Sequence, residues 1–401
     1  MISVIPETIH RLFCGERLVF LFSATQSPDR KIDSVFSQNH TYVIKGIAVL
    51  FMVLHHVNNK YYNSINLQWY LQHSADIGDL ILLFFSTAGK VCVPLLTILS
   101  GFGLSKSYLK YKANHKGFSS EVRFTISHLL QFYSVFWIYL LLYTIKDTIF
   151  LKLFQLYGFT FKAWSNVFLQ VFGLSKLFGI KNFGTKTFII RSFGDWFVSA
   201  IIIFYIIFPI LFWITKKSKV TAIILAAAPW IFKPYVNALG IRTDSVVFCM
   251  LAFVTGILFA QCRTLDNLTS LTGAKYKVLS IFLVLLGFAL RLVFSFYADY
   301  FFALTLICFG TLVLSAIKYL DRFFILFGKH SANIWLSHIV ILQMVNKAYH
   351  FTKPVKYLIV LAIALLLSLT VEFVKKITWY SKGVKKLRAL IEKRQQKNPA
   401  A

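Results

Sequence analysis

Residues 195–214 read DWFVSAIIIFYIIFPILFWI, a stretch whose one charged side chain, Asp195, stands at its start. A helix that crosses a bilayer needs about 20 mostly apolar residues, and this stretch has that length. It is followed by Lys216, Lys217 and Lys219, the basic flank that is typical of the cytoplasmic end of a span. The stretch therefore predicts a membrane-spanning helix, and similar stretches recur along the chain.

The composition of the whole chain also indicates a membrane protein. Of 401 residues, 57% are hydrophobic and only 14% are charged, whereas a soluble domain is about 25% charged. Yet 43 Lys and Arg stand against 15 Asp and Glu, a net charge of +28. A soluble protein this basic would suggest a nucleic-acid partner. The apolar excess, with 42 phenylalanines, instead favours a polytopic membrane protein with basic loops and no nucleic-acid partner.

Hydropathy predicts an all-α fold of about ten transmembrane helices. The candidate spans lie at roughly 42–58, 79–104, 124–145, 195–214, 220–239, 245–262, 276–297, 299–317, 323–346 and 355–376. The stretch 147–194 is too interrupted for a span, although it has room for an interfacial helix around 148–172. The chain thus divides into a leader (1–41) with a short amphipathic segment at Ile9–Phe22, a transmembrane domain (42–376) and a basic tail (377–401).

Basic residues are concentrated in alternate loops, and this bias sets the orientation of a membrane protein. It predicts that both termini are cytoplasmic, in agreement with an even number of spans, which places both termini on the same side. We therefore expect a multi-pass protein of the cell (inner or plasma) membrane, in contact with membrane lipids. The five cysteines have no paired spacing, so neither a disulfide framework nor a metal site is expected.

The first predicted span carries ionisable side chains at membrane depth, where such groups are costly and mark candidate sites. Lys45 and His56 are eleven residues apart, about three full turns, so they share a helix face and lie about 16 Å apart along the axis. His55 points about 80° away from Lys45. Lys45 and His56 are therefore candidates to line one internal cavity. In the alternative reading, Lys45 extends to the cytoplasmic interface and both histidines lie at the outer headgroups.

Two further segments place glycine and polar residues at the ends of spans. Residues 99–105 read LSGFGLS and close the second span on the predicted cytoplasmic side. The alternative to a binding role there is close packing, since glycine lets helix backbones approach. Residues 194–199 read GDWFVS and open the fourth span on the predicted outer side. Asp195 is either a catalytic acid or, more commonly for such a position, a helix N-cap.

Residues 328–338 read GKHSANIWLSH. Ser331 and His338 are one heptad apart and face the same way, which suits a polar site or an interhelical hydrogen bond. Arg291 in the seventh predicted span and Lys90 in the second are further basic residues at membrane depth. They suit an anionic ligand and a lipid headgroup equally well.

The chain lacks several known motifs, and their absence limits the reaction types that its sequence suggests. The chain shows no convincing membrane-embedded carboxylate relay of the kind that proton and cation transporters carry. It also contains no Gly-rich phosphate loop, no Cys/His zinc pattern and no Gly-x-Ser-x-Gly elbow. An embedded histidine with basic companions suits proton abstraction or acyl transfer from an anionic donor.

These four segments, in this order among ten predicted helices, resemble membrane-bound acyltransferase family 3, which includes O-acetyltransferases of bacterial surface polysaccharides. The family carries a basic residue, ten further residues and a histidine in its first span, then a Ser-Gly-Phe/Tyr signature, a Trp-Phe segment with a later proline, and a late Gly-Lys-x-Ser…His element. The resemblance covers about 42–346. The matching residues here are Lys45, His56, Ser100, Gly101, Phe102, Trp196, Phe197, Pro209, Gly328, Lys329, Ser331 and His338.

Two positions depart from the family pattern. The basic residue of the first span is commonly arginine, and Lys45 lacks the planar fork that suits phosphate, although a point-charge contact to phosphate or a carbonyl remains open. The loop after the second span often carries paired arginines, whereas this chain has Arg123 followed by His128. A basic rim is still present, formed by Lys106, Lys110, Lys112 and Lys116.

The resemblance implies an O-acyltransferase that uses an acyl-CoA, most simply acetyl-CoA, and needs no metal. The wording around Lys45 and His56 is most similar to members found in exopolysaccharide and capsule gene sets, which implies a glycan acceptor. Two other classes also need many spans and basic surfaces. One is a transporter or flippase for a polysaccharide repeat unit. The other is a glycan polymerase, for which Lys181, Lys186 and Arg191 of the 147–194 loop would be candidates.

Under the acyltransferase hypothesis His56 is either a general base on the sugar hydroxyl or a transient acyl acceptor. Lys45 would neutralise donor charge or polarise the carbonyl, and Asp195 would orient the imidazole. The basic rim would attract the phosphates of CoA. The expected substrate contacts are Ser100, Gly101, Trp196, Arg291, Ser331 and His338, and the expected CoA contacts are Lys106, Lys110 and Arg123.

Overall fold

A computed structural model describes residues 36–57, 88–115, 117–147, 155, 158–174, 195–231, 244–294, 298–348 and 351–393. Within these ranges the chain is almost entirely helical and contains no strand. The predicted amphipathic segment Ile9–Phe22 and the loop residues Lys181, Lys186 and Arg191 lie outside the described residues.

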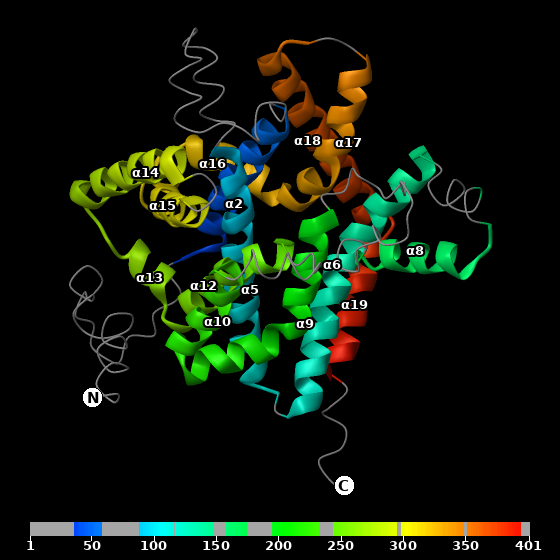
Figure 1. The fold of residues 1–401 in the computed structure, drawn as a ribbon, viewed down its shortest axis with the longest axis horizontal. Helices are drawn as coiled ribbons and strands as arrows, with labels where there is room; N and C mark the ends of the chain where they lie inside the picture. Colours follow the sequence, from blue (N-terminus) through cyan, green and yellow to red (C-terminus); the bar gives the residue numbers. More distant parts are fainter. Residues whose placement is uncertain are drawn as a thin grey trace.

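Seven of the described helices are long and apolar enough to cross a bilayer, and two shorter apolar helices fall on the predicted fifth and sixth spans. The protein is therefore an all-α polytopic membrane protein, as predicted (Figure 1). The seven are α2 (Gln38–Val57), η3–α5 (Gly89–Val91 and Cys92–Lys112), α6 (Phe118–Asp147), α9 (Asp195–Lys217), α14 (Ala274–Phe294), α15–η6 (Asp299–Leu312 and Leu314–Ala316) and α18 (Lys353–Ile377). The two shorter ones are α10 (Lys219–Ile231) and α12 (Asp244–Gln261).

The predicted ninth span, 323–346, is not one helix. It is divided between α16 (Leu320–Lys329) and α17 (Ser331–Ala348), which meet at His330. The short helix α16 is amphipathic, and only Phe327 and Gly328 of its residues are buried. A hydropathy average detects the apolar content of both pieces but carries no information on the change of direction between them.

Three more helices complete the described structure: α8 (Phe161–Val171), α13 (Thr264–Thr269) and α19 (Tyr380–Lys393). The basic tail is thus largely helical, and α19 runs beside α6 (Figure 1). The Tyr380 hydroxyl donates to the Ser134 carbonyl at 2.9 Å, and Arg388 Nε donates to Ser127 Oγ at 3.0 Å. Helix α8 falls within the predicted interfacial region around 148–172.

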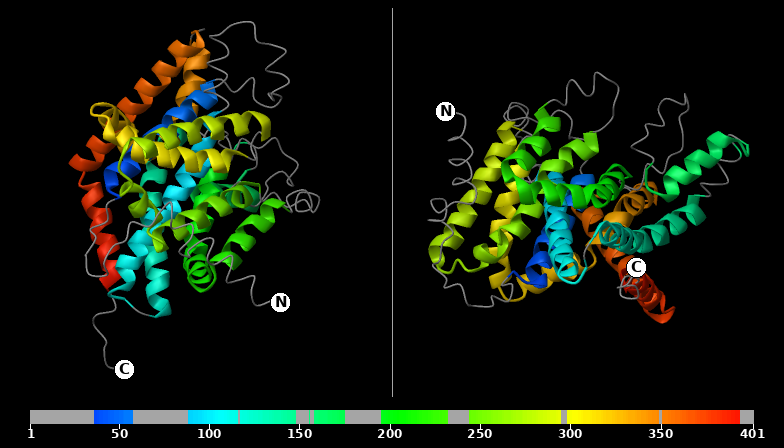
Figure 2. Two further views of the ribbon diagram at one scale, coloured as in Figure 1. Left: turned by 90° about the vertical axis from the view of Figure 1, so that its left-hand side faces the viewer. Right: turned by 90° about the horizontal axis from the view of Figure 1, so that it is seen from below.

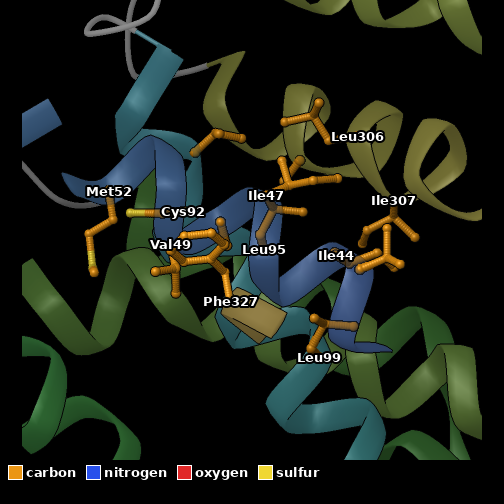
Figure 3. Close-up of a cluster of buried hydrophobic side chains, with 14 of the residues drawn as sticks. Ile44, Ile47, Val49, Met52, Cys92, Leu95, Leu99, Leu306, Ile307 and Phe327 are labelled. Carbon is orange, nitrogen blue, oxygen red and sulfur yellow. The ribbon is translucent and has the colours of Figure 1, made fainter. Parts of the chain in front are cut away.

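Helix α2 lies at the centre of the bundle and packs against α5, α15, α16, α17 and α18. On one flank α14 and α15 lie side by side (Figure 2). Figure 3 shows apolar side chains of α2, α5 and α15 converging in the core, among them Ile44, Ile47, Leu95, Leu99 and Ile307. This core holds the first predicted motif in a fixed position relative to its neighbours.

Helices in lipid associate through close packing, since lipid tails are as apolar as leucine. Gly46 on α2 faces the backbone of Phe324, and Gly328 on α16 faces the backbone of Tyr42, so closely that a Cβ atom on either glycine would clash with a carbonyl oxygen. The glycine of the Gly-Lys-x-Ser element therefore lies against the first span, near Lys45. Two distant parts of the predicted site meet at this crossing.

Candidate functional site

Helices α2 and α17 bring two histidines together. The ring centroids of His56 and His338 are 5.0 Å apart, with the ring planes tilted by 48°. The ring of His55 also lies 5.0 Å from that of His56, edge to face. Sequence reasoning placed Lys45 with His56 and Ser331 with His338, and the structure joins these two pairs at the imidazoles.

The hydrogen bonds of His338 determine its tautomer. Nδ1 lies 2.8 Å from the carbonyl oxygen of Trp335 and 3.1 Å from that of Ile334. Carbonyl oxygens only accept, so Nδ1 must carry the proton, and Nε2 of the neutral ring presents a lone pair. Nε2 is buried and has no hydrogen-bond partner among the described residues. The His338 ring therefore presents an unprotonated nitrogen, Nε2, and is held in a fixed orientation beside His56.

His55 and His56 occupy different surroundings, as the helical-face argument predicts. His55 is buried, and its Cβ lies against Gly89 of η3, where a side chain on residue 89 would clash. His56 is only partly buried. His56, unlike His55, both contacts His338 and is partly accessible. A group that reacts with a substrate needs such access.

Lys45 lies on the same continuous helix, α2, as His56. The unbroken helix confirms an axial separation of about 16 Å between the two residues. The Lys45 side chain is partly buried and has no hydrogen bond or ion pair within the described part of the chain. At that axial separation Lys45 suits a remote part of a long ligand better than the atom that His56 contacts.

The Trp-Phe segment joins the same region through α17. Phe197 on α9 is buried, and its ring meets that of Trp335 edge to face at 5.1 Å. Trp196 is 39% exposed. Asp195 is the first residue of α9, and its side chain lies outside what the structure describes. Three of the four sequence motifs thus meet around α2 and α17.

Comparison with protein families identifies the family of this chain. The family model described as "Acyltransferase domain" matches residues 42–373. The chain belongs to acyltransferase family 3. Comparison with curated proteins and with solved structures found no match. The family match covers α2 to α18, so the protein is a membrane acyltransferase, and the histidine pair lies inside the matched region.

The Ser-Gly-Phe signature of acyltransferase family 3 lies in a helix crossing in this protein. Gly101 on α5 faces the backbone of Phe253 on α12, and Gly256 on α12 faces that of Ile98. Both crossings are too close for a Cβ atom. Ser100 donates to the Leu96 carbonyl of its own helix at 2.8 Å. The close-packing reading of this segment therefore accounts for Gly101, and substrate contact by Ser100 and Gly101 stays a prediction.

Arg291, an expected substrate contact, forms an ion pair within the acyltransferase. It is 4% exposed and pairs with Asp299 at the start of α15. Lys90 of η3 lies within electrostatic range of both side chains. The sequence alone does not pair Arg291 with Asp299, because the two residues lie on different predicted spans. The ion pair ties α14 to α15.

The three expected CoA contacts differ in their surroundings. Lys106 forms an ion pair with Asp266 of α13 at 2.9 Å, and that carboxylate also accepts from the backbone N–H of Phe36. Lys110 is exposed. Arg123 has a buried Nη1 atom with no hydrogen-bond partner among the described residues. Arg123 is therefore the one of the three whose donor capacity is buried and unused.

A polar network at the start of α17 escaped the sequence analysis. Nδ2 of Asn333 donates to Ser368 Oγ at 2.8 Å and to Glu372 Oε1 at 3.1 Å. His330, between α16 and α17, lies 2.8 Å from Ser368 Oγ through Nδ1. The rule that polar residues in membrane segments are functional candidates would have found Asn333.

The described residues contain no group of three His, Cys, Asp or Glu side chains able to hold a metal ion. The site that the structure assembles is instead an imidazole pair with a basic residue at the far end of α2. Such a site can remove a proton from an alcohol and can bind an extended anionic donor.

Proposed function

We propose that this acyltransferase transfers an acetyl group from acetyl-CoA to a hydroxyl of a surface polysaccharide or a lipid-linked glycan. The observation that carries the proposal is the pairing of His56 with His338 inside the family domain. A fixed lone pair on His338 and a partly accessible His56 supply the base that an alcohol needs before it can attack a thioester.

In the proposed reaction His56 takes the proton of the sugar hydroxyl while the oxygen attacks the thioester carbonyl. The C–S bond then breaks, and the CoA thiolate receives the proton from His56. The neutral His338 ring, with its lone pair on Nε2, stabilises the imidazolium that forms on His56. In a variant of this mechanism His56 first carries the acyl group itself.

Lys45 has a separate role in this proposal. Because the two residues lie about 16 Å apart along the axis, we assign Lys45 to a remote part of the donor and not to the carbonyl that reacts beside His56. It neutralises phosphate charge of the donor instead. This assignment requires the start of α2 and the basic ends of α5 and α18 to face the cytoplasm, where acyl-CoA is found, and the histidine end to face the acceptor.

The test compares His56→Gln with His55→Gln in purified protein, with CoA release and acetylation of the host polysaccharide as readouts. We expect at least a hundredfold loss for His56→Gln, since general-base catalysis contributes about 10²–10⁴-fold. His55→Gln keeps most activity because it preserves the volume packed against Gly89. Full activity of His56→Gln would refute the assigned role. A protein that moves glycan without releasing CoA would be a transporter.

A further inference from the structure

Two buried polar atoms near Glu372 have no hydrogen-bond partner among the described residues. One is the hydroxyl of Tyr139 on α6, and the other is Oδ1 of Asn333 on α17. Tyr139 is 0% exposed and Asn333 is 4% exposed. Tyr139 packs in one buried cluster with Val371, the residue before Glu372, and Glu372 is the carboxylate that accepts from Asn333 Nδ2. A free donor and a free acceptor are thus gathered around one side chain.

The orientation of the Asn333 amide follows from its partners. Glu372 Oε1 can only accept, so the NH₂ group of Asn333 must face it, and Oδ1 is left as the free acceptor. The carboxylate of Glu372 is itself bound by Lys375 at 2.7 Å. The surroundings of the two free atoms are therefore nearly neutral, and the adjacent carboxylate disfavours an anionic ligand.

A neighbouring tyrosine shows that such a hydroxyl normally finds a partner here. Tyr143 lies one turn further along α6, and its hydroxyl donates to the carbonyl oxygen of Leu336 on α17 at 2.7 Å. Buried polar groups without partners are rare and often mark the place of a ligand. Tyr139 and Tyr143 pack in one buried cluster with residues of α17, but only the Tyr143 hydroxyl has a hydrogen bond to that helix.

We propose that Tyr139 and Asn333 bind an amide group of the pantetheine arm of the acyl donor. The Tyr139 hydroxyl donates to the amide carbonyl, and Asn333 Oδ1 accepts from the amide N–H. This inference rests on the proposed function, because it assigns the path of the same donor. An amide matches the pair because it offers one donor and one acceptor without charge.

The position of Asn333 suits an arm that extends to the histidines. Asn333 precedes His338 by five residues on α17, a rise of about 7.5 Å with a rotation of about 140° about the helix axis, so an arm bound at Asn333 curves around α17 to reach His338. On its other side lies the end of α18, where Lys375 and Lys376 stand in the last turn. An arm that enters at this basic end passes Tyr139 and Asn333 before its thioester reaches His338 and His56.

Tyr139→Phe tests the inference by calorimetric titration of the full-length protein with CoA and with the nucleotide half of CoA, which lacks the arm. We expect the variant to bind CoA about 3- to 10-fold more weakly, the value of one hydrogen bond, and to bind the nucleotide half as the wild type does. Equal losses for both ligands, or no loss for either, would overturn the inference.

Tyr143→Phe is the matched control, because it removes a hydroxyl from the same helix face that already has a partner. It should lower the melting temperature and leave CoA affinity within twofold, whereas Tyr139→Phe should leave the melting temperature of the free protein unchanged or raise it. A fall in melting temperature for Tyr139→Phe alone would make its hydroxyl structural and overturn the inference. So would a Tyr139→Phe variant that changes only the KM for the glycan acceptor.

Different results would overturn the proposed function and the inference about Tyr139 and Asn333. Wild-type protein that neither binds CoA nor releases it from acetyl-CoA would overturn the proposed donor, and this inference with it. Wild-type protein that releases CoA, with a Tyr139→Phe variant of unchanged CoA affinity, would overturn the inference alone.

Discussion

Phe197 on α9 packs edge to face against Trp335 on α17, and Trp335 lies three residues before His338 on the same helix. The carbonyl oxygen of Trp335 accepts the hydrogen bond from His338 Nδ1. The Trp-Phe segment of the family is thereby connected to the imidazole that lies beside His56. We therefore expect this segment to help hold α17 in place.

Phe197→Ala should lower both stability and turnover. Truncation of a buried phenylalanine costs about 3–5 kcal/mol, and the gap left beside Trp335 frees α17 to shift the His338 ring. Thermal unfolding in detergent and kcat for CoA release measure the two effects. Trp213→Ala is the control, since that side chain lies on the same helix, α9, and is 57% exposed. An equal loss of turnover in both variants would contradict the positioning role.

Gly101→Ala should destabilise the protein by about 1–3 kcal/mol. An added Cβ atom would meet the Phe253 carbonyl oxygen, a rigid backbone atom that cannot rotate away. Gly103→Ala is a close control on the same helix, because nothing lies within 4 Å of its added Cβ atom. That substitution should be neutral or stabilising by up to about 1 kcal/mol through helix propensity. Chemical or thermal unfolding of the two variants decides between packing and a purely functional glycine.

Arg291→Met should cost about 3–5 kcal/mol, because it leaves the Asp299 carboxylate buried without its strongest partner. Asp299→Leu should cost a similar amount, because it leaves the Arg291 guanidinium buried without its carboxylate partner. The double variant should recover a large part of the loss, since it removes both charges. Unfolding free energies of the four proteins form the cycle that measures this coupling. Additive losses would show that Arg291 and Asp299 act independently.

Hydropathy predicted the bounds of the first and last spanning helices to within a few residues. The stretch 42–58 corresponds to α2 at Gln38–Val57, and 355–376 corresponds to α18 at Lys353–Ile377. Both predictions succeed because the bilayer thickness dictates the length of the apolar run. The prediction of one helix over 323–346 was wrong, because two consecutive apolar helices, α16 and α17, have the same average hydropathy as a single helix.

The candidate site was predictable in part. Helical periodicity placed Lys45 and His56 on one face of a helix, and α2 is unbroken between them. Periodicity contains no information on which helices are neighbours, so the meeting of His56 with His338 had to come from the structure. Tyr139 was missed because a tyrosine in an apolar helix usually finds a carbonyl oxygen, as Tyr143 does.

The separation of Lys45 from His56 predicts a kinetic signature of its own. Lys45→Met should raise the KM for acetyl-CoA roughly tenfold or more, because a hydrogen bond between charged groups contributes about 1.5–3 kcal/mol. Its kcat should change little, since the two residues lie about 16 Å apart along the helix axis. Lys45→Arg should bind the donor at least as well, because guanidinium offers a fork that matches phosphate. Initial rates at varied donor concentration separate the two constants.

Lys216→Met is the control for a general loss of positive charge, since Lys216 is an exposed residue in the last turn of α9. It should leave the KM for acetyl-CoA within twofold. A fall in kcat for Lys45→Met at saturating donor would show that the lysine reaches the reacting carbonyl. The donor would then have to bend back along α2, and the assignment of Lys45 to phosphate would be wrong.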